Sequence, residues 1–75
     1  MSKTKPTGRV TLPVFNLGGS QGRARLLQHR LERVGGVESA YVSLSTEMAY
    51  IVYDPEEIAL EALRKRLEQL DTPSG

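Results

Sequence analysis

The 75-residue sequence contains no cysteine and no tryptophan, and only 5% of its residues are aromatic. The lack of cysteine excludes disulfides, thiolate metal sites and thiol catalysis. No apolar run approaches the roughly 20 residues that a membrane-spanning helix needs, and the start of the chain has no signal-peptide apolar segment. We therefore expect a cytoplasmic chain, or the cytosolic portion of a larger protein, with no membrane segment in these 75 residues.

A chain of this length can form one domain at most, near the lower limit for a single apolar core. Its hydrophobic content of 39% and charged content of 25% are typical of a globular protein. We expect residues 9–70 to form the domain, with residues 1–8 and 71–75 as flexible tails.

The first half of the domain predicts one strand followed by one helix. Apolar and polar residues alternate from Arg9 to Phe15, as in a half-buried strand. Pro13 has no backbone N–H to donate, which favours a position at the edge of a sheet. Ser20 can cap a helix whose apolar residues recur at three and four, and Gly35-Gly36 can end that helix.

The second half predicts an antiparallel hairpin and a second helix. The strands are expected at residues 37–44 and 48–53, and Asp54-Pro55 is typical of a helix start. The resulting order is that of an α+β ferredoxin-like βαββα(β) sandwich, with two helices on one face of the sheet and the last strand short or absent. Without that strand the first strand becomes an open edge, so we expect a homo-oligomer or a partner strand there.

Charge is distributed unevenly along the chain. Seven basic residues and one acidic residue occur up to residue 33, whereas three basic and eight acidic residues follow. Such a split favours either two solvated faces or a basic surface for an anionic partner. The basic residues of the first helix are Arg23, Arg25, Arg30 and Arg33.

Two segments carry a family pattern, namely residues 34–44, VGGVESAYVSL, and residues 49–55, AYIVYDP. They resemble the heavy-metal-associated domain of copper chaperones and metal-transporting ATPases, and the resemblance extends over about residues 9–70. In that family two cysteines in the loop after the first strand bind a soft ion such as Cu(I). The cysteine positions fall near Ser20 and Arg23 in this sequence.

The resemblance therefore implies a docking or regulatory module of a metal-transport system that has kept the scaffold and lost the metal ligands. It implies no cofactor, and a protein partner with an acidic surface that meets the loop and the basic first helix. His29 and Glu32 could offer two other metal ligands, but two ligands three residues apart are common by chance. We expect no native metal site.

An alternative is nucleic-acid binding on the open face of the sheet. The RNA-recognition fold has the same element order and stacks bases on strand aromatics. Parity places four candidate residues on that face, namely Phe15, Tyr41, Met48 and Tyr50. The proline on the first strand and the net charge of only +1 argue against this alternative.

An enzymatic interpretation starts from the glycine-rich residues 18–22 at the helix start, which could hold an anion. They loosely resemble the phosphate loop of acylphosphatases, but Arg25 is one residue short of the arginine that family needs, and no asparagine follows the second strand. No base, nucleophile pair or carboxylate dyad is visible in the sequence. We therefore expect no catalysis.

Overall fold

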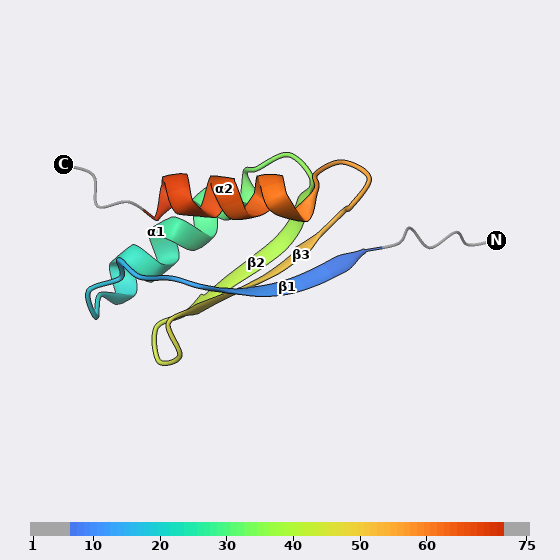
Figure 1. The fold of residues 1–75 in the computed structure, drawn as a ribbon. Coiled ribbons are helices and arrows are strands. Elements are labelled where there is room, and N and C mark those ends of the chain that lie inside the picture. Colours follow the sequence, from blue (N-terminus) through green and yellow to red (C-terminus); the bar gives the residue numbers. More distant parts are fainter. Residues whose placement is uncertain (1–6, 72–75) are drawn as a thin grey trace.

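A computed structural model describes residues 7–71, which form a three-stranded antiparallel sheet with two helices on one face (Figure 1). The elements in chain order are β1 (Gly8–Pro13), α1 (Gln21–Glu32), β2 (Val37–Ser43), β3 (Met48–Tyr53) and α2 (Leu60–Leu70). β3 lies between β1 and β2 and pairs with both. This confirms the predicted ferredoxin-like fold. Residues 7–71 include no fourth strand, so β1 is an edge of the sheet, as Pro13 indicated.

The core lies between the sheet and the two helices, where the inward residues of each element meet. Strand alternation and helical spacing select these residues, as the sequence pattern predicted for both helices and for the hairpin. No helix within residues 7–71 is long and apolar enough to cross a membrane. The buried apolar side chains are Val14, Leu17, Ala24, Leu27, Leu31, Ala40, Val42, Ala49, Ile51, Tyr53, Leu63 and Leu67.

Several predicted element boundaries are wrong: β2 ends at Ser43 and not at residue 44, and α1 ends at Glu32, before Gly35-Gly36. β1 ends at Pro13, not at Phe15. α2 begins at Leu60, not at Pro55, because the Asp54 carboxylate accepts a hydrogen bond from the Glu56 N–H at 2.9 Å and holds a separate turn. Ala59, which is in an extended conformation with φ −78° and ψ 155°, separates this turn from the helix.

Asp71 joins the end of α2 to the loop that follows β1. Its carboxylate accepts hydrogen bonds from the backbone N–H groups of Phe15, at 2.9 Å, and Asn16, at 3.2 Å. The Asn16 side-chain amide also donates to the Asp71 carbonyl. Asp71 is buried and belongs to the packed domain, so the predicted tail from residue 71 begins one residue too early. The predicted tail residues 1–6 and 72–75 lie outside the described residues.

Gly36 sets the close approach between the end of α1 and the turn before α2. Its φ of +95° is a conformation that side chains with a Cβ rarely adopt. A Cβ at this position would lie 2.6 Å from Cγ2 of Ile58. Its carbonyl accepts a hydrogen bond from the Asp54 N–H at 2.7 Å, which ties the two segments together.

Replacing Gly36 by alanine is expected to lower the free energy of unfolding by about 2–4 kcal/mol, from backbone strain and the clash with Ile58. Gly35→Ala is the matched control, because an added Cβ at Gly35 meets nothing within 4 Å. Urea unfolding of both variants measures the difference. Equal stability of the two variants would contradict the role assigned to Gly36.

Replacing Asp71 by alanine is expected to lower the free energy of unfolding by about 2–3 kcal/mol, because two partly buried N–H groups lose their acceptor. Lys65→Ala is the control, since Lys65 is exposed on the same helix. Urea unfolding gives the energies, and amide hydrogen exchange should show faster exchange of Phe15 and Asn16 in the Asp71 variant alone. Unchanged exchange at these two amides would rule out the contact in solution.

Candidate functional site

The loop from β1 to α1 is held at both ends by buried side chains. Val14 and Leu17 are each only 2% exposed, so the loop is anchored in the core on either side of Asn16. Gly18 and Gly19 follow with φ of +59° and +69°, both left-handed values that glycine adopts at low cost. The loop therefore reaches the start of α1 through a fixed turn.

Ser20 and Arg23, where the resemblance places the two cysteines, lie next to each other at the start of α1. The Ser20 hydroxyl accepts a hydrogen bond from the backbone N–H of Arg23 at 3.2 Å, which confirms the predicted cap. The Arg23 guanidinium donates to the Asn16 carbonyl at 3.1 Å. Ser20 thus caps the helix, and Arg23 places a positive charge on the loop.

His29 and Glu32, the other candidate metal ligands, do not join a larger group of possible ligands within residues 7–71. His29 and Glu32 are both exposed on α1. Within residues 7–71 there is no group of three or more histidine, cysteine, aspartate or glutamate side chains that could hold a metal ion.

Three of the four predicted arginines line up along one side of α1. Arg23, Arg30 and Arg33 are all exposed, and their spacing places them on the same side of a helix as Leu26. Arg25 points to another side, because it follows Arg23 by only two residues. We call Arg23, Leu26, Arg30 and Arg33 the arginine stripe.

Leu26 is the member of the stripe that sequence analysis missed. It is 53% exposed, whereas its neighbour Leu27 is buried in the core. The signal was present, since Leu26 lies outside the apolar spacing of the helix. Leu26 adds exposed apolar surface to a helix side that carries arginines, which are enriched at protein interfaces.

The open face of the sheet carries two stacked tyrosines. Tyr41 and Tyr50 are direct partners in the register of β2 and β3, and their ring centroids lie 6.1 Å apart with an interplanar angle of 21°. Met48 is two residues before Tyr50 on β3 and lies on the same face. Phe15, which parity placed there, lies beyond the end of β1, so the predicted set of four is wrong in this member.

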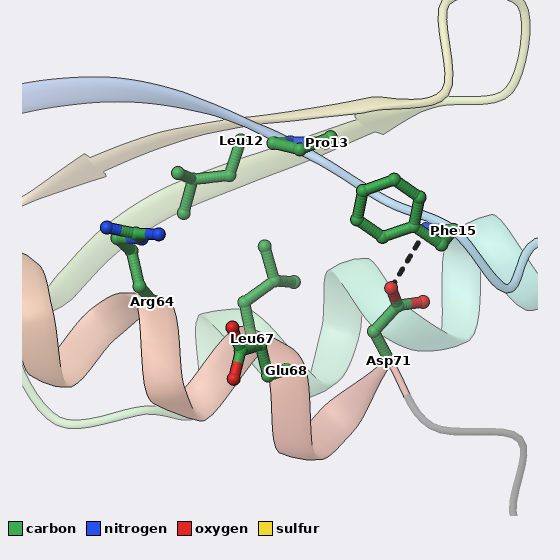
Figure 2. A pocket seen from close by; sticks show the side chains of 7 residues that line it. All are labelled: Leu12, Pro13, Phe15, Arg64, Leu67, Glu68 and Asp71. Atoms are coloured by element: carbon green, nitrogen blue, oxygen red, sulfur yellow. Dashed lines mark hydrogen bonds between the residues drawn. The ribbon is translucent and has the colours of Figure 1, made fainter.

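Phe15 instead lines a groove between β1 and α2, with a volume of about 230 Å³ (Figure 2). Its side chain is 78% exposed at one end of the groove. The sequence offered no signal for this groove, because its walls come from opposite ends of the chain. The residues that line it are Leu12, Pro13, Phe15, Arg64, Leu67, Glu68 and Asp71.

No protein-family model matches the chain, and no curated protein matches it in sequence. Solved structures do match it. The chain is similar to the water-soluble region of the P-type ATPase CopA from Bacillus subtilis, with 26% identity, a TM-score of 0.78 and coverage of 91% of this chain and 44% of that one. The chain thus spans less than half of that region.

A second structure, of a copper form of a Bacillus subtilis CopA variant, gives 27% identity and a TM-score of 0.71, with 89% of this chain and 87% of that one covered. The N-terminal soluble domains of the same CopA give 26% identity and a TM-score of 0.80, with 91% and 46% covered. Together with the fold, these similarities confirm the resemblance found in the sequence: the chain has the fold of heavy-metal-associated domains such as those of CopA, and it contains no cysteine.

Proposed function

We propose that this chain is a docking or regulatory module of a metal-transport system, which binds an acidic protein surface and carries no Cu(I). The similarity to domains of a copper-transporting type of ATPase supports the metal-transport context. The observation that supports the absence of a bound ion is the hydrogen bond from the Arg23 guanidinium to the loop carbonyl of Asn16.

Arg23 argues against an ion in this loop for an electrostatic reason. A guanidinium stays positively charged at every physiological pH, and it repels a cation placed beside it. Its hydrogen bond to Asn16 stabilises the loop, and the Ser20 hydroxyl is already used by the helix start. Neither group offers the thiolate that Cu(I) prefers.

The arginine stripe supports an acidic partner. Positive charges along one helix face raise the rate of encounter with a negative surface, and arginine can bind carboxylates with two parallel hydrogen bonds. Leu26 would add apolar burial at the centre of such a contact. Arg25 lies apart from the stripe and is assigned a smaller contribution.

This proposal places the module in the cytoplasm and assigns it no enzymatic activity. A nucleic-acid role on the open sheet face is not proposed, because Phe15 lies outside that face and leaves the two tyrosines without a third aromatic partner.

Titration with Cu(I) and with Zn(II) under reducing conditions, against a competing chelator, tests the loss of the metal site. We expect no stoichiometric binding that outcompetes the chelator. The double variant Ser20→Cys, Arg23→Cys is the positive control, since it places two thiols at the family's positions and should gain Cu(I) binding. Tight one-to-one binding by the natural sequence would overturn this part of the proposal.

Charge reversal tests the docking surface. In an NMR titration with a soluble metal-transporter domain that has an acidic surface, Arg30→Glu should weaken binding by roughly tenfold, because it removes one attraction and adds one repulsion. Raising the ionic strength should weaken the natural sequence as well.

Arg66→Glu is the matched control, because Arg66 is equally a surface arginine but lies on α2. It changes the net charge by the same amount and should leave the affinity within about twofold if the contact is local. The proposal fails if the two variants bind equally, or if the chemical shift changes avoid α1.

A further inference from the structure

The outer edge of β1 carries unpaired backbone groups that point away from the sheet. The Val14 N–H turns toward β3 and donates to the Glu47 carbonyl at 3.0 Å, whereas the Phe15 N–H turns the other way, to Asp71. Because backbone groups alternate along a strand, the N–H groups of Arg9 and Thr11 point outward like that of Phe15. No strand within residues 7–71 pairs with this edge.

The opposite edge of the sheet, formed by β2, is covered by a side chain at one position near the end of the strand. There the Val42 N–H on β2 donates to Oε1 of the Gln28 side chain at 3.1 Å. A side chain of α1 therefore covers one backbone N–H within β2, whereas Asp71 covers backbone N–H groups only beyond the end of β1. This difference leaves β1 as the edge at which another strand can pair.

The groove lies directly beside this open edge (Figure 2). Leu12 and Leu67 give it an apolar lining, and the exposed Phe15 ring lies at its end. A strand that adds to β1 therefore brings its neighbouring side chains against an apolar surface and gains burial besides backbone hydrogen bonds.

The charges on α2 at the groove indicate which strand adds there. Arg64 and Glu68 both line the groove, one helical turn apart, and both are exposed. A second copy related by a two-fold axis runs antiparallel, so it presents the same two charges in the opposite order. The groove is thus charge-complementary to itself, which fits a copy of this chain and not a uniformly acidic or basic segment.

We propose that two copies of this chain associate through β1, with the two strands antiparallel, to form one continuous six-stranded sheet flanked by the two α2 helices. The outward N–H groups of Arg9 and Thr11 donate to the partner strand, and the apolar grooves close against each other. Arg64 and Glu68 select the antiparallel arrangement. This interface is separate from the arginine stripe on α1, so the dimer and the docking function can fail independently.

Sedimentation equilibrium of the full chain from about 10 µM to about 1 mM, with hydrogen exchange at both ends of that range, tests the dimer. We expect a reversible dimer in which the Arg9 and Thr11 amides exchange more slowly at the higher concentration. A strict monomer throughout the range overturns the proposal, and so does a dimer in which these two amides exchange at the monomer's rate.

Thr11→Pro removes one outward donor without touching a hydrogen bond to β3, and it should weaken association at least roughly tenfold. Thr11→Val is the matched control, because it retains the N–H and should associate like the natural sequence. Equal association of the two variants, with both folded by circular dichroism, overturns the proposal.

Charge reversal on α2 gives a test that does not depend on β1. Arg64→Glu makes the charges at the groove both negative, and Glu68→Arg makes them both positive, so each variant alone should dimerise more weakly. A mixture of the two should form heterodimers, and the double swap should regain self-association, because opposite charges then face each other again.

Arg66→Glu is the control, because Arg66 lies outside the groove, and it should leave the association unchanged. Self-association of each single variant at the natural strength, with no preference for heterodimers, overturns the assignment of α2 to the interface.

Discussion

The contact on which the rest of the structure depends is that of the Asp71 carboxylate with the backbone of Phe15 and Asn16. It joins segments more than fifty residues apart and fixes where β1 ends, where α2 lies and how the loop leaves the sheet. Because a carboxylate can accept several hydrogen bonds at once, one side chain satisfies two backbone donors that the sheet does not use. Asp71 also lines the groove, and the loop that it holds leads to the candidate site.

On the other side of the same loop, Arg23 donates to the carbonyl of Asn16. Asn16 is therefore held from two directions, through its N–H by Asp71 at the end of α2 and through its carbonyl by Arg23 in the first turn of α1. Two side chains of the chain itself thus hold this loop, and one of them places a positive charge on it.

The two edges of the sheet differ for a related reason. α1 supplies Gln28 to the edge of β2, whereas α2 supplies Asp71 only beyond the end of β1. The central part of β1, around Thr11, therefore has outward backbone groups and an apolar groove beside them. Within residues 7–71 a helix side chain covers part of one edge of the sheet, and the strand at the other edge has no such cover, which is the physical basis for the proposed dimer.

The sequence by itself determined the element order, the core and the edge position of β1, because these depend on local periodicity, on glycine and on a proline without an N–H. It also determined that no thiolate site exists, since there is no cysteine. Only the tertiary structure decided the end of β1, the late start of α2 and the place of Phe15. The end of β1 depends on Asp71, the start of α2 on the turn held by Asp54, and the place of Phe15 on the groove. Local sequence patterns do not show these contacts. The arginine stripe was visible in the sequence in both its parts, since its charges are there and Leu26 lies outside the apolar spacing of the helix, and the structure shows that Leu26 is exposed beside the buried Leu27.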